Sequence, residues 1–446
     1  MSRALPGLVA LCVLGTVLAG STWGAPLPGV FLVGYDPKDA DSARLAIQAS
    51  GGSVRRASPE LGFAVVDAAD GDAFQRLARA SPFIQYVETD DVTGMTGAQW
   101  NGAQWNGAQW NGAQWNGAQW NGAQWNTLRN EDPAWGEAQR SAHAWTILHA
   151  PSKWSYDTGS TDPGLVWQWG TWAIQAPTAW QTSKGSGATT LCVLDSGVAW
   201  DHPDIKPNYG AGWNAIDPSR SAYDDAGHGT HIAGIAAARV GNAWGVAGVA
   251  NAKILAVKVL DANGRGHESD LAFGLAWCAA QGADVAVMAL SVTEADHPTL
   301  DRALQFAAQR DVLLLASAGN DGPCVECVAY PARDSRVVAV SALDGNGRLA
   351  AFSNQGSDVE IAAPGVAVLG PFPGNAFVFG SGTSQAVAYA AGMAVLVRDA
   401  NPALSAPQVR DLLHATAVDV SLEGRDPATG YGLVNANHAL RLALAS

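Results

Sequence analysis

The sequence predicts an α/β protein in which helices cover both faces of a parallel β-sheet, preceded by a small α+β unit. The first observation is that near-continuous apolar runs alternate with amphipathic segments from residue 189 onward, a pattern typical of a parallel sheet buried on both faces. The second is a compact series of strand and helix patterns over residues 29–92. With 446 residues, the chain is also long enough for more than one domain.

The first 25 residues have the layout of a secretory signal peptide. Arg3 precedes an apolar stretch at 8–18, and small residues follow up to Ala25. This stretch is shorter than the roughly 20 residues that a membrane-spanning helix needs, and no later run is long and uninterrupted enough to span. We therefore expect a secreted protein without a membrane span.

Residues 26–95 are expected to form the small α+β unit. Apolar alternation predicts strands and helical periodicity predicts helices in the order strand, helix, strand, strand, helix, strand. The predicted elements cover residues 30–35, 40–49, 53–57, 63–68, 72–79 and 84–88. This order is also that of a ferredoxin-like domain.

Six tandem copies of Gly-Ala-Gln-Trp-Asn fill residues 97–126. The five-residue spacing matches neither the helical nor the strand period. One interpretation is a low-complexity linker covering residues 96–150. A second is a ladder of Trp rings that stacks on polysaccharide or a cell surface, and a third is a short β-solenoid coil.

Residues 151–446 are expected to form the main α/β domain. Strands are predicted at 191–194, 254–260, 285–290 and 312–316, and helices from His228 and at 271–280 and 300–309. In such sheets the ligand crevice lies beyond the carboxyl ends of the strands. Asp195 and Asn320 both follow apolar strands and are therefore candidates for this crevice.

Three glycine-containing segments carry an acid, a base and a nucleophile. They are Val193-Leu194-Asp195-Ser196-Gly197, Gly227-His228-Gly229-Thr230-His231 and Gly380-Ser381-Gly382-Thr383-Ser384. A serine hydroxyl needs an imidazole to take its proton and a carboxylate to orient that imidazole. The chain order Asp, His, Ser differs from that of chymotrypsin-like enzymes and of α/β-hydrolases.

At these segments the chain resembles the subtilisin-like serine proteases, or subtilases. The resemblance covers roughly residues 167–439 and includes the runs 248–250, 256–260, 316–322 and 362–365 in their usual order. It implies that Ser384 is the nucleophile, His228 the base and Asp195 its orienting partner. It also implies that Asn320 donates to the oxyanion, and that residues 26–95 are an inhibitory propeptide.

The resemblance extends to substrate and calcium sites. Substrate is expected to bind as an extended strand, with a pocket for the residue before the scissile bond. The residues expected at this pocket are Ala289, Leu290, Ser291, Ala318 and Ala329. Their small side chains favour a large apolar residue, although Ser291 replaces a usual glycine and Glu326 lies nearby, so a basic residue is an alternative. Asp204 and Asn242 match positions that bind a structural calcium; no cofactor is expected for catalysis.

Two residues depart from the family pattern after the nucleophile. Gln385 stands where subtilases carry methionine, and Ala388 where they carry proline. The spacing is unchanged, so we expect altered helix rigidity rather than lost catalysis. His231 lies one helical turn after His228 and competes for the base role. The resemblance assigns that role to His228 and leaves His231 a structural one.

Charge and cysteine content narrow the function further. The net charge of −14, from 26 basic and 40 acidic residues, offers no basic stripe and argues against nucleic acid as a partner. Cys192 and Cys278 lie in apolar runs and are expected to be buried thiols. Cys324 and Cys327 lie three residues apart in a loop bounded by glycine and proline, which favours a local disulfide in a secreted protein.

These observations predict a secreted serine endopeptidase, made as a zymogen, that acts on protein or peptide substrates through an acyl-enzyme. Its own propeptide is expected to act as an intramolecular inhibitor. The alternative is a non-catalytic surface-binding protein that uses the Trp repeats, and a third candidate is a stalk or surface-layer component. The intact set of Asp195, His228, Ser384 and Asn320 favours the enzyme.

Overall fold

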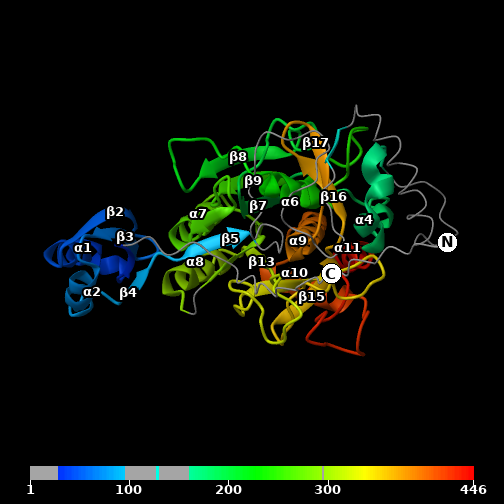
Figure 1. Ribbon diagram of the computed structural model, residues 1–446. Helices are drawn as coiled ribbons and strands as arrows, with labels where there is room; N and C mark the ends of the chain where they lie inside the picture. Colours follow the sequence, from blue (N-terminus) through cyan, green and yellow to red (C-terminus); the bar gives the residue numbers. More distant parts are fainter. Residues whose placement is uncertain (1–28, 96–126, 130–159, 294–295) are drawn as a thin grey trace, which may run out of the picture.

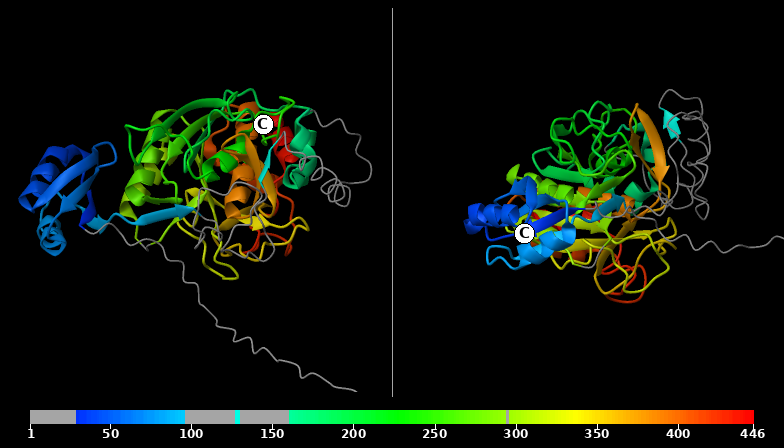
Figure 2. Two further views of the ribbon diagram at one scale, coloured as in Figure 1. Left: turned by 45° about the horizontal axis from the view of Figure 1, so that its top comes forward. Right: turned by 60° about the vertical axis from the view of Figure 1, so that its left-hand side comes forward.

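The computed structural model describes residues 29–95, 127–129, 160–293 and 296–446. The Gly-Ala-Gln-Trp-Asn repeats at 97–126 lie outside the described residues, so none of their three interpretations is tested. The described residues form a small N-terminal unit and a larger main unit, which lie side by side (Figures 1 and 2). A single strand, β5 (Val92–Met95), extends from the N-terminal unit into the main one.

The N-terminal unit has the predicted order of strands and helices. Its elements are β1 (Val30–Gly34), η1 (Pro37–Asp39), α1 (Ala40–Ala49), β2 (Gly52–Ser58), β3 (Phe63–Ala68), α2 (Gly71–Arg79) and β4 (Tyr86–Thr89). The sheet is antiparallel with the order β2-β3-β1-β4. Helix α2 begins where the Asp70 side chain accepts a hydrogen bond from the Ala73 N–H, an N-cap that the sequence Asp-Gly-Asp favours.

Alternation along β1 and β3 gives this small sheet two buried faces. Phe31, Val33 and Val66 belong to the core under α1 and α2. Leu32 and Phe63 point the other way and share a hydrophobic cluster with two helices of the main unit. Because side chains alternate in a strand, one sheet is covered by its own helices on one side and by the main unit on the other.

The main unit is built on a seven-stranded parallel sheet with the order β15-β14-β13-β11-β7-β9-β8. The strands are β7 (Thr190–Asp195), β8 (Tyr209–Asn214), β9 (Lys253–Lys258), β11 (Val285–Met288), β13 (Leu313–Ser317), β14 (Val337–Leu343) and β15 (Val359–Pro364). The central ones are apolar and fully buried, as a parallel sheet covered on both faces requires. The predicted fold class is confirmed.

Helices cover both faces of this sheet. One face packs against α6 (His228–Ala237), α9 (Thr383–Ala400), α10 (Ala406–Thr416) and α11 (Ala436–Ala445). The other packs against α7 (Glu268–Ala280) and α8 (Pro298–Ala308). Consecutive strand residues such as Val193 and Leu194 join opposite clusters, so alternate side chains anchor the two helical layers.

The remaining elements form smaller sheets and short helices at the edges. They are β6 (Thr127–Arg129), η2 (Pro163–Trp167), α4 (Trp169–Ala173), α5 (Ala176–Ala179), β10 (Arg265–His267), β12 (Leu290–Val292), β16 (Val368–Phe372) and β17 (Ala376–Gly380). The strand β5 lies between β10 and β12, and β17 lies between β16 and β6. Within the described residues, no helix has the length and apolar character needed to cross a membrane.

The cysteines differ in part from expectation. Cys324 and Cys327 form the predicted local disulfide. Cys192 and Cys278, predicted to be buried thiols, form a second disulfide with their Cα atoms 5.9 Å apart. The prediction was wrong because β7 and α7 pack directly against each other in one cluster, although the two cysteines are 86 residues apart in sequence. Local sequence patterns carry no signal for such a long-range pairing.

Candidate active site

Asp195 and His228, the predicted acid and base, lie at the carboxyl end of the sheet. Asp195 is the last residue of β7 and His228 the first of α6, and both are buried. Nδ1 of His228 lies 2.8 and 2.9 Å from the two carboxylate oxygens of Asp195. A carboxylate in this position fixes the tautomer of an imidazole and stabilises its protonated form.

The third group, Ser384, reaches the same edge from another helix. It is the second residue of α9 and is buried, and its hydroxyl donates to the carbonyl of Ala289 at 3.3 Å. β11 and β7 pair with Met288 opposite Leu194, so Ala289 and Asp195 are the next residues along two neighbouring strands. Asp195, His228 and Ser384 therefore lie at one end of the sheet, where the crevice of such folds lies.

Asn320 lies on the loop after β13, close to the start of α9. Its side-chain oxygen accepts hydrogen bonds from the backbone N–H and the hydroxyl of Thr383, at 2.8 and 3.2 Å. Because the oxygen end of the amide is fixed in this way, its NH₂ group is held as a donor. The first turn of α9 adds backbone N–H groups, including that of Ser384, at the positive end of the helix dipole.

Two further side chains support this site, and sequence reasoning missed both. Asp224 is buried and accepts hydrogen bonds from the backbone N–H groups of Gly227 and Thr230, at 2.7 and 2.8 Å. Ser196 donates to Asp224 at 2.8 Å and accepts from the N–H of Gly229 at 2.9 Å. Together they bind the turn that carries His228. No short-range signal marks Asp224, since the N-cap of α6 is Gly227 and Asp224 lies three residues before it.

His231 occupies a different environment from His228. Nε2 of His231 lies 3.1 Å from the carbonyl oxygen of Val378, and Nδ1 lies 3.3 Å from the amide nitrogen of Gln385. Burial lowers the pKa of His231 to about 3, because a charged imidazolium is costly away from water. A neutral, fully buried ring with these partners agrees with a structural role.

A strand of the N-terminal unit fills the groove beside these residues. β5 pairs antiparallel with β12, with Leu290 opposite Met95 and Ser291 opposite Gly94. On its other side it pairs with β10, where Arg265 lies opposite Gly94. Figure 1 shows this strand reaching from the small unit into the main one. The main unit therefore has a groove that accepts an extended chain through backbone hydrogen bonds on both sides.

The five residues predicted for the pocket lie on three segments that backbone hydrogen bonds join beside this groove. Ala289, Leu290, Ser291 and Ala318 are buried, whereas Ala329 is half-buried. Ala329 donates its N–H to the carbonyl of Ala318 at 2.8 Å, which joins two of these segments. Glu326 is exposed and accepts from the hydroxyl of Ser357 at 2.9 Å, so its carboxylate is bound to the neighbouring loop.

The residues predicted to bind calcium lie together with a third oxygen donor. The carboxylate of buried Asp204 accepts from the amide of Asn242 at 3.0 Å and from the N–H of Val246 at 2.9 Å. Asp162 is also buried and accepts from the N–H of Asn242 at 2.9 Å. Burial and the negative charge of Asp162 raise the pKa of Asp204 to about 7. Two buried carboxylates suit a hard cation, whereas the oxygen of the Asn242 amide accepts from the N–H of Trp244 at 2.8 Å. Asp162 was missed by sequence reasoning.

Carboxylates crowd the boundary between the two units. Asp90 accepts from the N–H and hydroxyl of Ser269, at 3.0 and 2.7 Å, and Glu88 accepts from the N–H of Thr299 at 3.1 Å. They thus cap the first turns of α7 and α8. Ligand atoms of Asp91, Glu268 and His297 lie within 4.8 Å of one another. Nδ1 of His297 is 2.9 Å from a carboxylate oxygen of Glu268, a hydrogen bond that links two of the three.

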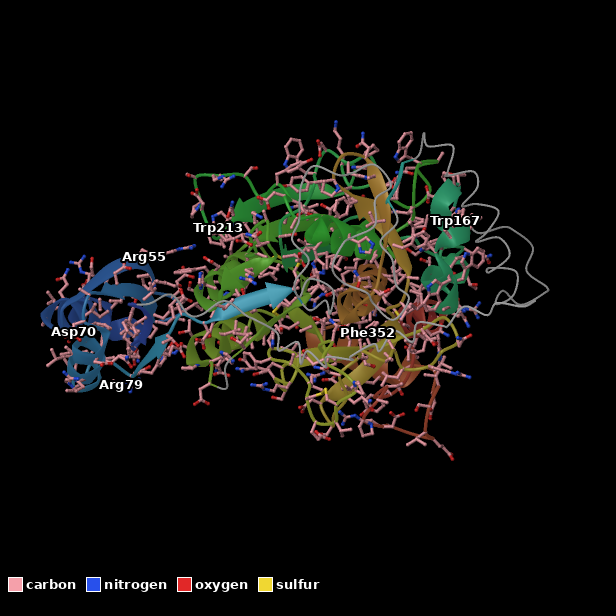
Figure 3. The ribbon with its side chains drawn as sticks, in the orientation of Figure 1. Arg55, Asp70, Arg79, Trp167, Trp213 and Phe352 are labelled. Atoms are coloured by element: carbon pink, nitrogen blue, oxygen red, sulfur yellow. A yellow bond between two sulfur atoms is a disulfide. The ribbon has the colours of Figure 1, made fainter. Side chains whose placement is uncertain are left out.

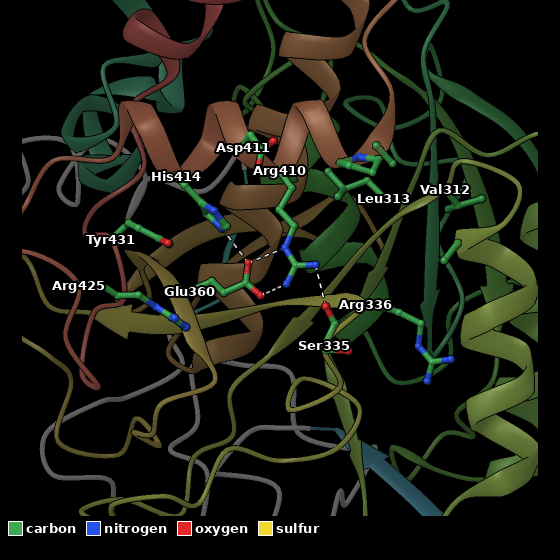
Figure 4. A pocket seen from close by; sticks show the side chains of 13 residues that line it. Val312, Leu313, Ser335, Arg336, Glu360, Arg410, Asp411, His414, Arg425 and Tyr431 are labelled. Atoms are coloured by element: carbon green, nitrogen blue, oxygen red, sulfur yellow. Dashed lines mark hydrogen bonds and ion pairs between the residues drawn. The ribbon is translucent and has the colours of Figure 1, made fainter.

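A pocket of about 530 Å³ lies between α10 and β15, away from these residues (Figure 4). Glu360 sits within it, bound by Arg410 on two atoms and by Nε2 of His414 at 2.7 Å. Burial alone would raise the pKa of Glu360, but these hydrogen bonds outweigh it and lower that pKa. Arg410 and His414, two of the side chains that line the pocket, are thus already bound to one carboxylate.

Comparison with known proteins agrees with this geometry. The model of the subtilase family matches residues 186–432, and that of the fervidolysin N-terminal prodomain matches residues 17–90. Subtilisin BL of Lederbergia lenta is 40% identical over 274 residues, which are 61% of this chain and 98% of the relative. Thermitase of Thermoactinomyces vulgaris is 38% identical over 275 residues, 61% of this chain and 96% of its own.

A solved structure resembles the whole described molecule. Fervidolysin from Fervidobacterium pennivorans superposes with a TM-score of 0.72 at 24% identity, over 94% of this chain and 61% of its own. At that identity the match shows the fold alone, and this chain spans about three fifths of the other. The family model and the subtilisin relatives go further: the chain belongs to the subtilase family of serine peptidases and carries a fervidolysin-like prodomain.

Proposed function

We propose that the protein is a secreted serine endopeptidase made as a zymogen, with Asp195, His228 and Ser384 as its catalytic triad. The observation that carries this proposal is the pair formed by His228 and both oxygens of Asp195, beside the strand end that Ser384 contacts. We assign residues 1–25 to the signal peptide, 26–95 to the prodomain, 96–150 to a linker and 151–446 to the protease domain.

In the first half of the reaction, His228 accepts the hydroxyl proton of Ser384 while the serine oxygen attacks the carbonyl carbon of the scissile bond. The imidazolium is stabilised by Asp195, which stays ionised. The negative charge that develops on the carbonyl oxygen is met by the amide of Asn320 and the backbone N–H of Ser384. The carbon–nitrogen bond then breaks as His228 gives its proton to the leaving amine.

In the second half, water hydrolyses the ester formed on Ser384. His228 takes a proton from the water as its oxygen attacks the acyl carbon, and then returns a proton to the serine oxygen as the ester bond breaks. A carboxylic acid leaves and the free enzyme is restored. No cofactor is needed for these steps, since every proton is held by a side chain of the triad.

Substrate is proposed to bind where β5 lies in the precursor. An extended peptide between β10 and β12 has backbone partners on both sides, as β5 has, and its next residue meets the pocket of Ala289, Leu290, Ser291, Ala318 and Ala329. The small side chains of this pocket support a preference for a large apolar residue. The contact of Glu326 with Ser357 gives no support to a basic preference.

The same contacts make the prodomain an intramolecular inhibitor. β5 occupies the groove that a substrate needs, and the sheet of the prodomain is anchored against α7 and α8. A structural calcium is proposed at Asp204, Asn242 and Asp162, where it would tie the loop after α6 to the segment before η2. Its role is in stability, since it lies outside the triad.

Casein hydrolysis by the purified chain tests this proposal. We expect wild-type protein to cleave casein and Ser384→Ala to lose at least a thousandfold of that activity. Ser421→Ala, an exposed serine outside the site, is the matched control and should retain full activity. Asn320→Ala should lose about a hundredfold to a thousandfold of turnover, a cost established for this donor in a subtilisin. Equal casein loss with wild-type and Ser384→Ala protein would defeat the proposal.

A further inference from the structure

An arginine of the prodomain is held between two aromatic rings of the protease domain. The guanidinium carbon of Arg56, on β2, lies 3.5 Å from the ring centre of Phe273 and 5.0 Å from that of Trp213. One of its N–H groups donates to the carbonyl of Ala215 at 2.7 Å. Rings within about 6 Å of a cation attract it electrostatically, and guanidinium adds stacking and fixed hydrogen-bond directions.

The three groups that hold Arg56, namely the rings of Phe273 and Trp213 and the carbonyl of Ala215, are called the socket here, and all of them belong to the protease domain. Phe273 lies on α7, Trp213 on the edge strand β8, and Ala215 directly after that strand. Trp213 is itself stacked on Trp277, with ring centres 6.1 Å apart and an interplanar angle of 16°. Figure 3 shows Trp213 on the side of the protease domain that faces the prodomain. The socket is therefore held by a strand and a helix that do not depend on Arg56.

The neighbouring arginine provides a contrast on the same strand. Arg55 pairs with Asp67 of the prodomain itself, with Nε 3.1 Å from a carboxylate oxygen. Both of these side chains are about half exposed. The strand is bulged between Val54 and Arg56; Arg55 pairs within the prodomain, whereas Arg56 reaches the rings and the Ala215 carbonyl of the protease domain.

Loss of the prodomain would open this socket to solvent. Phe273 is 7% exposed in the precursor, where Arg56 covers one side and Phe63 lies 4.9 Å from its ring centre. Without them, Phe273, Trp213 and Trp277 form an exposed aromatic surface, and such surfaces on soluble proteins usually mark interaction sites.

A carboxylate adds charge to the same place. Asp270 lies one turn before Phe273 on α7, and Arg56 acts on it electrostatically. Burial and the nearby Asp90 raise the pKa of Asp270 to about 7 in the precursor. Both causes come at least in part from the prodomain, so release of that domain favours the ionised carboxylate beside the rings.

We propose that Trp213, Phe273 and the Ala215 carbonyl form a guanidinium-binding exosite, which Arg56 fills in the precursor and arginine side chains of protein substrates fill in the processed enzyme. The ligand class follows from the occupant that the socket already holds. We infer that substrates use this exosite from its position. Phe273 lies on α7, which begins directly after β10, and β10 is one wall of the substrate groove. This inference rests on the proposed release of the prodomain.

The first experiment tests the ligand class and needs no catalysis. In the full chain carrying Ser384→Ala, Arg56→Ala should lower the melting temperature, and millimolar ethylguanidinium should restore part of the loss. Ethylammonium, which lacks the planar fork, should restore less. The matched control is Arg55→Ala in the same background. An ethylguanidinium effect of the same size in both variants would overturn the proposal.

The second experiment tests use by substrate in the processed enzyme. Casein is compared with casein whose arginines are blocked by phenylglyoxal, and a tetrapeptide nitroanilide serves as a substrate too short to reach the socket. We expect wild type to prefer intact casein, and Phe273→Leu to lose about threefold to tenfold of that preference. Its tetrapeptide kcat/KM should be unchanged. Phe306→Leu is the matched control, since the guanidinium of Arg310, just after the end of α8, lies 3.4 Å from the ring centre of Phe306.

The outcomes separate this inference from the proposed function. An equal casein preference in Phe273→Leu and Phe306→Leu, with an active wild type, overturns the exosite and leaves the protease standing. In a second outcome, ethylguanidinium restores the melting temperature of Arg56→Ala but wild type cleaves neither substrate. That result overturns the proposed function and, with it, the substrate role of the socket. Rescue that is confined to Arg56→Ala, together with a selective loss in Phe273→Leu, supports both.

Discussion

Release of the prodomain should become faster as pH rises, and Glu88 should be a main cause. Glu88 lies at the boundary, where burial and the negative charges of Glu268 and Asp91 raise its pKa to about 9. One of its carboxylate oxygens is buried without a hydrogen-bond partner among the described residues. In a released prodomain the group is in water, and its pKa returns to about 4.3.

The sign follows from which state holds the proton. Between about pH 4.3 and 9 the bound state of Glu88 keeps a proton that the released state loses. The complex is therefore strongest below that window and weakens as pH rises through it. One proton corresponds to a change of at most about tenfold per pH unit in the release equilibrium, and so to at most about a hundredfold between pH 6 and 8.

The assay follows the appearance of peptidase activity after precursor purified at pH 5 is transferred to buffers from pH 5 to 9. Each rate is divided by the activity of fully processed enzyme at the same pH, which removes the pH dependence of catalysis. Glu88→Gln mimics the protonated carboxyl and keeps an acceptor for the Thr299 N–H. We therefore expect slower activation at pH 8 and a flatter pH profile in this variant.

The control is Glu60→Gln, an exposed glutamate of the prodomain, which should activate like wild type at every pH. A profile for Glu88→Gln as steep as that of Glu60→Gln would refute the reasoning. Asp270 contributes in the same direction, because burial and Asp90 raise its pKa to about 7. The activation rate of Glu88→Gln should accordingly still rise somewhat with pH below pH 8.

Three further predictions concern maturation, calcium and stability. β5 ends with Met95 opposite Leu290, and Ser384 contacts the carbonyl of Ala289, the residue before Leu290. We therefore expect processing at the Thr96–Gly97 bond. Edman sequencing of the processed enzyme should then begin with Gly-Ala-Gln-Trp-Asn. Chelation by EDTA should lower the melting temperature of wild type but not of Asp204→Asn, and an EDTA response of equal size in both would argue against calcium there. Glu360→Ala removes three charged hydrogen bonds, each contributing about 1.5–3 kcal/mol. Urea unfolding should show that the free energy of unfolding falls by at least ~2 kcal/mol. For the control Asp411→Ala, at an exposed position, the loss should be less than ~0.5 kcal/mol.

Much of the fold could be predicted from local sequence, because strands buried on both faces read as apolar runs. The predicted strand at 63–68 and helix at 40–49 match β3 and α1 to the residue. The boundaries shift where polar residues join an element: α7 begins at Glu268 rather than at 271, since its acidic first turn suits the helix dipole but breaks the apolar pattern.

A residue of the site could be predicted only where a short segment around it has a recognisable sequence pattern. Asp195, His228 and Ser384 stand in glycine-containing turns with a recognisable order. Asp162 and Asp224 do not, because a carboxylate that binds backbone N–H groups looks like any other aspartate in sequence, whether those groups lie nearby or on a distant loop. The pairing of β5 with β10 and β12 is equally non-local, since its partners lie some 170–200 residues away.

The prodomain boundary combines attraction and repulsion in a way that suits a temporary inhibitor. The paired strand β5, the Arg56 socket and the caps from Asp90 and Glu88 all favour the bound state. The caps, however, bring carboxylates against Glu268, so the groups that bind the helix ends also repel one another. Once the covalent link is cut, the prodomain is held by noncovalent contacts alone, which also include hydrogen bonds from Arg302 to the carbonyls of Tyr35 and Gly62. Each proton lost from the carboxylates at this boundary then weakens the complex further. After release, the exposed aromatic rings of the socket become available to another cation.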